Sequence, residues 1–186
     1  MNYSEYEGFP PPLTNGGLNE HNVAGRDVWS PSRPELVEMT PNPQTGPQYS
    51  DLSRIAMERA RTAREAVEII GALIDEHGYS TYGGNSHMFA DENEGWVLLN
   101  FSGGKGLWIA ERLGPDDIRM SYPGYIHNIP LDFQDSDDYM GSDNFISFAV
   151  AQGWYDPDDN EPFNVTRVYG VDEERYPRSD MEKELR

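Results

Sequence analysis

The stretch of this sequence with the clearest potential for chemistry is residues 15–20, NGGLNE. Two glycines beside side-chain amides let backbone N–H groups approach a ligand closely, and an amide N–H can stabilise an oxyanion. The same residue types form tight turns, and Asn-Gly is a strong turn signal. From the chemistry alone, a turn is the favoured interpretation.

Acidic stretches raise the question of a metal site. Residues 135–138 and 156–160 begin like EF-hand loops, but neither has Gly at the sixth position or Glu at the twelfth. No H-x-x-x-H or H-E-x-x-H spacing occurs among the four histidines, His21, His77, His87 and His127. We therefore expect solvated acidic loops, no bound metal and no cofactor.

The sequence shows no clear motif for phosphate binding or for a serine or cysteine nucleophile. Residues 102–106, SGGKG, join two expected strands, whereas a phosphate loop must lead into a helix N-terminus, so we predict a glycine hairpin. No G-x-S-x-G nucleophile elbow is present. The chain has no cysteine, which excludes disulfides, thiolate metal sites and a cysteine nucleophile within these residues.

Composition limits the class of partner. The 186 residues suffice for one domain with a core, and 33 acidic against 14 basic residues give a net charge of −19. Such a surface repels nucleic acid and anionic membranes, so we expect neither as a partner. No apolar run of about 18 residues and no signal peptide are present. The compartment stays open, with the cytoplasm slightly favoured, and so does a halophilic source.

A long helical segment, residues 51–77, must position the rest. Its expected break near Arg61 comes from a T-x-x-E capping pattern at Thr62 and Glu65, and Gly78 is the expected C-cap. The start of the segment, Ser50 or Asp51, is the predicted N-cap. One apolar stripe predicts packing on a sheet; it consists of Leu52, Ile55, Ala56, Ala60, Ala63, Val67, Ile70 and Ile74.

The remaining segments read as strands, loops and one more helix. Residues 18–29 are strand-like and residues 30–50 are a predicted loop. An antiparallel meander is expected from residues 87–90, 95–101 and 106–112, with residues 95–101 central because both faces are apolar. Residues 118–122 are a predicted fourth strand. A helix is expected over residues 142–152, capped by Ser142 or Asp143 and stopped by Gly153.

Four stretches in this order resemble one family: NGGLNE at 15–20, IAMERARTAREAVEII at 55–70, FADENEGWV at 89–97 and YMGSDNFISFAVAQGWYDP at 139–157. They are similar to bacterial and archaeal dipeptidases of the N-terminal-nucleophile hydrolases, relatives of bile-salt hydrolase and penicillin V acylase. The resemblance covers residues 13–169. It implies an α+β fold, an αββα sandwich with an antiparallel sheet and packed helices.

The resemblance also implies a mechanism. An N-terminal cysteine would act as nucleophile and, through its α-amino group, as its own base. The family's N-E motif falls on Asn19 and Glu20, so Asn19 would donate its amide to the oxyanion hole. A second oxyanion asparagine follows the fourth strand in relatives, and Asn128 is the candidate here.

This sequence departs from the family because the opening Cys-Thr is absent. We interpret it as an internal part of a cysteine-type dipeptidase: an extended start (1–12), a partial domain (13–170) and a charged tail (171–186). Short peptides would be substrates of the complete protein, which could form a homo-oligomer. The alternatives are a non-catalytic acidic binding domain that keeps the fold, and a linear-amide acylase of the same superfamily.

Overall fold

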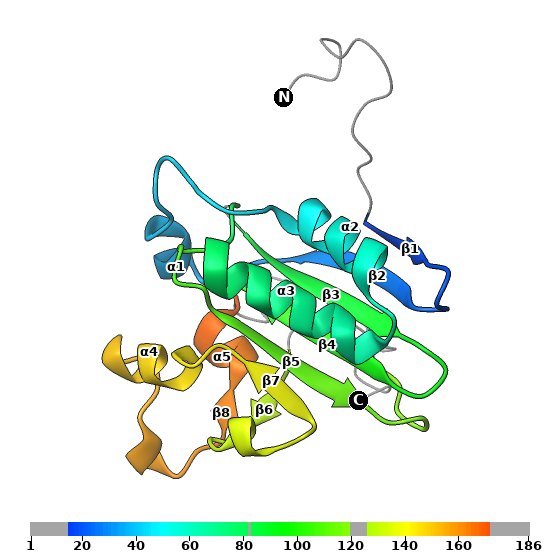
Figure 1. The fold of residues 1–186 in the computed structure, drawn as a ribbon. Helices are drawn as coiled ribbons and strands as arrows, with labels where there is room; N and C mark the ends of the chain where they lie inside the picture. The colour runs from blue at the N-terminus through cyan, green and yellow to red at the C-terminus, as the bar shows by residue number, and fades with distance from the viewer. Residues whose placement is uncertain (1–14, 82, 120–125, 172–186) are drawn as a thin grey trace.

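A six-stranded antiparallel sheet forms the centre of the molecule (Figure 1). The structure is a computed structural model, and it describes residues 15–81, 83–119 and 126–171. The strand order is β1-β2-β3-β4-β5-β7. The strands are β1 (Gly16–Leu18), β2 (Ala24–Ser30), β3 (Gly84–Ala90), β4 (Gly95–Asn100), β5 (Trp108–Leu113) and β7 (Tyr139–Gly141). Helices pack on this sheet, so the predicted α+β class with an antiparallel sheet is confirmed.

Two helices, α2 (Tyr49–Arg59) and α3 (Ala63–His77), lie across one face of the sheet (Figure 1). The predicted break is confirmed, because the Thr62 side chain accepts a hydrogen bond from the Glu65 backbone N–H and starts α3. Gly78 follows α3 with a φ of +81°, as a C-cap glycine should. All the predicted stripe residues except Ile55 are buried: Leu52, Ala56, Ala60, Ala63, Val67, Ile70 and Ile74.

The N-cap of α2 was predicted wrongly. Gln48 occupies the cap, and neither Ser50 nor Asp51 does. The Gln48 side chain accepts from the backbone N–H of Asp51, while the Asp51 carboxylate accepts from the backbone N–H of Gln48. A glutamine therefore supplies the reciprocal cap that a shorter side chain supplies more often.

The meander β3-β4-β5 is confirmed, with β4 between β3 and β5 and inside the sheet. The turn after β4 is the predicted glycine hairpin, closed by a hydrogen bond from the Phe101 N–H to the Leu107 carbonyl. The predicted fourth strand is not seen in its described part, since Ile118 and Arg119 are not in a strand, and residues 120–122 lie outside the described residues. The edge of β5 is paired with β7 instead.

The Asn15-Gly16 signal marks a strand in the structure, so the predicted turn there is wrong. Gly16 pairs with Arg26 across β1 and β2, and the chain turns later, between Asn19 and Asn22. A Cβ atom on Gly16 would lie 2.0 Å from the carbonyl oxygen of Gly25. Glycine is therefore required for close approach of two strands. As a result β2 starts at Ala24, later than the predicted residue 18.

Two other predicted boundaries change. The predicted loop 30–50 contains a short helix, α1 (Pro34–Glu38), which begins with proline in its first turn. Helix α4 (Phe145–Ala151) has Asn144 as its N-cap, so the predicted caps Ser142 and Asp143 are wrong. The Ser142 hydroxyl is buried and accepts from the Trp108 N–H at 3.3 Å, which ties it to β5 and makes it unavailable to the helix.

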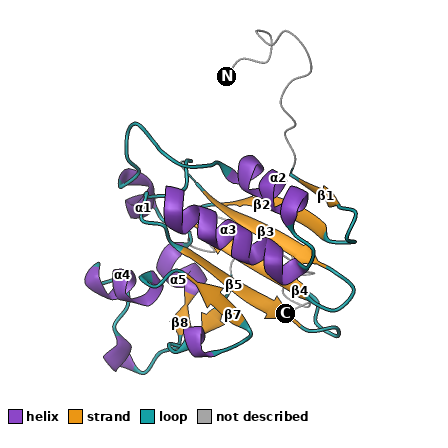
Figure 2. Ribbon diagram, in the orientation of Figure 1, coloured by secondary structure: helices purple, strands orange, loops and turns teal. Residues whose placement is uncertain are grey.

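The second face of the sheet is covered only in part. Over β4 and β5 it carries α1, α4, α5 (Val165–Tyr169), a two-stranded sheet of β6 (Asn128–Ile129) and β8 (Phe163–Asn164), and two 3₁₀ turns, η2 (Phe133–Asp135) and η3 (Pro157–Asp159) (Figure 2). Over β2 and β3 the face is open: Arg26 is exposed, and Val28 and Met88 are half-buried. No helix in the described part of the chain is long and apolar enough to cross a lipid bilayer.

Candidate functional site

Asn19 lies in the turn between β1 and β2 and ties that turn to helix α2. Its amide nitrogen donates to the carbonyls of Met57 (3.2 Å) and Ala60 (2.7 Å), and its amide oxygen accepts from the N–H groups of His21 and Val23, both at 3.0 Å. Both amide hydrogens are thus engaged by the C-terminal end of α2. The oxyanion role stays a prediction, and in this geometry it requires the amide to leave those carbonyls.

Asn128 lies on β6, far along the chain from that turn. Its side chain is exposed, and its amide oxygen accepts from the Asn164 amide at 2.9 Å. It lines a cavity of about 580 Å³ together with His127 and Arg167. Among the described residues, no contact or cavity contains both Asn19 and Asn128, so the structure does not bring the two predicted oxyanion donors together.

A buried polar network lies between the sheet and helix α2. The Asn85 amide nitrogen donates to an Asp27 carboxylate oxygen (3.1 Å) and to His87 Nε2 (3.3 Å), and His87 Nδ1 lies 3.0 Å from the Ser53 hydroxyl. Because an amide nitrogen only donates, Nε2 must accept, and the imidazole proton is then on Nδ1, which donates to Ser53. Burial lowers the pKa of His87 to about 3, against a smaller opposing effect of Asn100. The ring is neutral.

The same network contains a desolvated carboxylate and polar atoms without a partner among the described residues. Burial raises the pKa of Asp27, while the hydrogen bond from Asn85 opposes the rise. One oxygen of Asp27, the Tyr79 hydroxyl and both amide atoms of Asn100 are buried without a hydrogen bond of normal geometry to other described residues. Burial of such atoms costs stability. Asp27, Asn85, His87 and Asn100 are each no more than 3% exposed, so the network positions the sheet against α2 and cannot contact a substrate there.

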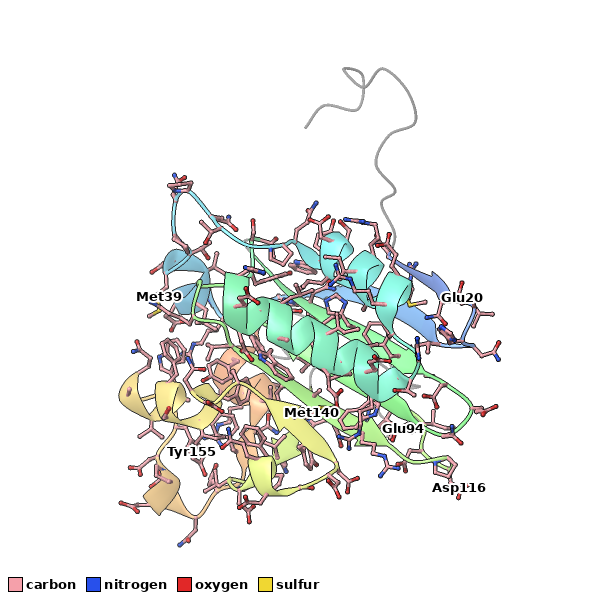
Figure 3. All side chains as sticks on the ribbon, in the orientation of Figure 1. Glu20, Met39, Glu94, Asp116, Met140 and Tyr155 are labelled. Atoms are coloured by element: carbon pink, nitrogen blue, oxygen red, sulfur yellow. The ribbon has the colours of Figure 1, made fainter. Side chains whose placement is uncertain are left out.

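The open face of the sheet holds a cleft of about 530 Å³. The residues at the bottom of the cleft have small side chains or none: Ala24, Ala90 and Gly95. The β3–β4 turn and the segment after β5 form its edges. Figure 3 shows Glu94 and Asp116, which belong to those two edges, at the same end of the sheet. This cleft combines an apolar floor with side chains of both charges.

Most charged side chains around the cleft already have partners. Arg119 contacts Glu111 through two N–O pairs of 2.9 Å each, and Arg112 donates to Glu94 at 2.6 Å. Burial alone would raise the pKa of Asp91, but three backbone N–H donors, those of Ala63, Asn93 and Glu94, hold it below its usual value.

Arg26 is different from these residues. Its side chain is exposed in the cleft, and it forms no ion pair with any described residue. The sequence interpretation missed it. The available signal was the alternation along β2, where Asp27 faces the helices and Arg26 must face the other side.

The residues described here also do not gather a metal-binding set. No group of three or more His, Cys, Asp or Glu side chains in residues 15–81, 83–119 and 126–171 could hold a metal ion. The candidate site is a cleft edged by charged side chains, in which Arg26 forms no ion pair with any described residue.

Comparison with known proteins defines the class of this protein. The chain is 27% identical over 162 residues to a probable dipeptidase of Latilactobacillus sakei, covering 86% of this chain and 32% of that protein. It is 33% identical over 158 residues to probable dipeptidase B of Lactococcus lactis, covering 83% of this chain and 32% of that protein. A dipeptidase of Bifidobacterium longum is 30% identical over 173 residues, which cover 83% and 31% of the two chains.

The family itself follows from a broader match. The sequence profile of peptidase family C69 matches residues 13–179, which is most of the chain. The protein belongs to peptidase family C69, in agreement with the resemblance found in the sequence. It spans only about a third of the length of the dipeptidases above, 31–32%.

Proposed function

We propose that this chain forms part of a cysteine-type dipeptidase that hydrolyses the peptide bond of short peptides. The observation that carries the proposal is the family C69 match over residues 13–179, together with relatives that are named dipeptidases. The chain has no cysteine, so the nucleophile belongs to a segment outside these 186 residues. In that segment an N-terminal cysteine acts as nucleophile, and its own α-amine acts as base.

The shape of the sheet supports an αββα sandwich. Such a sandwich needs a sheet with helices on its outer face and a second sheet on its inner face. Here α2 and α3 cover one face, and the other face is open over β2 and β3. Exposure of the half-buried Val28, which does not line the cleft, is avoided when another layer packs on it. The second sheet would come from the segments that the longer relatives have in addition.

The two asparagines keep their roles within this proposal. Asn19 and Asn128 are the proposed oxyanion donors, although each amide is engaged in a local hydrogen bond here. Neither a linear-amide acylase nor a non-catalytic binding domain is better supported by any observation on this chain. The acylase would use the same machinery and differ only in the shape of the pocket.

The test compares two forms of the protein. The 186-residue chain is expressed alone, and a longer polypeptide is expressed that adds the cysteine-bearing segment. Both are incubated with a panel of dipeptides. We expect hydrolysis only by the longer form, and inhibition of it by thiol alkylation with iodoacetamide. Turnover by the purified 186-residue chain, or turnover by the longer form that resists alkylation, would overturn the proposal.

A further inference from the structure

We propose that Arg26 binds the C-terminal carboxylate of the peptide substrate, in the cleft on the open face of the sheet. The inference rests on the proposed dipeptidase function and names a residue that would set the requirement for a free carboxylate. It stands on the position of Arg26, on its lack of an ion pair with any described residue and on the overall charge of the chain.

The position of Arg26 follows from the alternation of β2. Asp27 is buried on the helix face, where it accepts from Asn85, so Arg26 projects from the opposite face. Arg26 pairs in register with Met88 of β3, Met88 pairs with Val97 of β4, and Val97 pairs with Glu111 of β5. Arg26, Met88, Val97 and Glu111 are therefore neighbours in one row across four strands, and Glu111 forms an ion pair with Arg119.

The dimensions of this row suit a short peptide. Three interstrand spacings of about 4.8 Å place the backbones of Arg26 and Glu111 about 14 Å apart. An extended dipeptide spans about 7 Å, because each residue adds about 3.5 Å. A dipeptide can therefore lie on the half-buried Met88 with its carboxylate at the guanidinium of Arg26, whereas Val97 is 3% exposed and belongs to the core.

The lack of a partner sets Arg26 apart from the other basic residues. Of the basic residues in the described segments, only Arg26, Arg59, Arg61 and Lys105 have no ion pair, and only Arg26 of these four lines a cavity. With 33 acidic residues in the chain, most of the described arginines have a carboxylate within ion-pair distance. Arg26 keeps its planar fork of donors available, and that fork matches the two oxygens of a carboxylate.

The overall charge makes such a residue necessary. A net charge of −19 repels the carboxylate of a peptide from most of the surface. A substrate that carries both a free amine and a free carboxylate therefore needs a local cation where its carboxylate rests. The other two arginines near the cleft, Arg112 and Arg119, are neutralised by Glu94 and Glu111.

The test measures binding to the 186-residue chain, which has no cysteine to consume the ligand. Backbone amide shifts in NMR are followed during titration with Ala-Ala and with its C-terminal amide, Ala-Ala-NH₂. We expect the free acid to bind about fivefold more tightly than the amide, the range of an exposed ion pair. In Arg26→Gln the two ligands should bind equally. In Arg59→Gln, which removes an exposed, unpaired arginine from α2, the fivefold preference should remain.

The outcomes separate this inference from the proposed function. No binding of Ala-Ala, no preference for the acid, or the same preference in Arg26→Gln would overturn the role of Arg26. Melting curves of the variants exclude unfolding as the cause of a lost preference. If the longer, cysteine-bearing form fails to hydrolyse dipeptides while the Arg26-dependent preference persists, the dipeptidase proposal fails and carboxylate binding stands.

Discussion

The two faces of the sheet differ in how completely they are covered and in where their polar residues lie. The face under α2 and α3 is closed by a continuous apolar stripe, and in its middle it encloses a polar network around His87. The opposite face is closed only over β4 and β5, where aromatic residues such as Phe145 and Tyr169 pack together. Over β2 and β3 it presents an arginine and a hollow of small residues.

The difference shows where stability and function are separated in this molecule. The helix face contains buried ionisable and amide groups, but they contact each other and are closed to solvent. The open face carries charged groups around the cleft, and one of them, Arg26, forms no ion pair with any described residue. Polar residues on the first face therefore fix the packing of the layers, whereas the charged residues on the second are in a position to bind.

The largest expected change in the free energy of unfolding comes from a substitution on the helix face. Ile70 is fully buried in the apolar stripe of α3, so Ile70→Asp places an unpaired charge in the core. We expect a loss of about 4 kcal/mol in the free energy of unfolding, measured by urea denaturation. The matched control is Val28→Asp, at a half-buried position on the open face, with a change below about 1 kcal/mol. Equal losses in both variants would remove the difference between the faces.

The second prediction concerns pH and His87. Its pKa is about 3 in the folded protein and 6.5 in the unfolded chain. Well above pH 6.5 neither state binds the proton and the full stability is present. As pH falls from 6.5 toward 3, only the unfolded state gains the proton, so stability is lost by as much as about 1.4 kcal/mol per pH unit.

The measurement for His87 is the free energy of unfolding between pH 4 and 7. Because carboxylates also titrate in the lower part of this range, the quantity of interest is the difference between variant and wild type. His87→Gln should flatten the slope, and His21→Gln, at an exposed histidine, should leave it unchanged. An unchanged slope in His87→Gln would show that the imidazole is not excluded from solvent.

The smallest expected effect is at Asn19, which joins the edge of the sheet to α2. Asn19→Ala removes four hydrogen bonds of the side chain, and we expect it to lower the free energy of unfolding by about 2 kcal/mol. Asn93→Ala is the control, because Asn93 is exposed and its side chain forms no hydrogen bond with other described residues. In the longer form of the protein, a fall of about 10²–10³ in kcat with an unchanged melting curve would instead establish the oxyanion role.

The candidate site was much less accessible to sequence reasoning than the fold. Asn19 stood out because of its motif, but its partners on α2 are 38 and 41 residues away along the chain. Arg26 did not stand out, because one arginine in a strand has no distinctive spacing. Only the register of β2 with β3 places it beside Met88 in the cleft.

The sequence by itself determined the local elements. The spacing of Leu52 to Ile74, the cap at Thr62 and the glycine at Gly78 are local signals, since each acts within one or two turns of helix. The apolar run of β4 predicted a strand with both faces buried, and residues 96–100 are indeed buried on both sides of the sheet. The family was determined in the same way, by the order of motifs along the chain.

Only the tertiary structure decided what lies between elements. Three features depend on residues distant in sequence. They are the pairing of β5 with β7, the close approach of two strands at Gly16, and the hydrogen bond from the Trp108 N–H to the Ser142 hydroxyl. The same is true of the neutral state of His87 and of the lack of an ion pair between Arg26 and any described residue. Burial and pairing are properties of the surroundings that the fold assembles around a residue, and a sequence pattern records the residue without those surroundings.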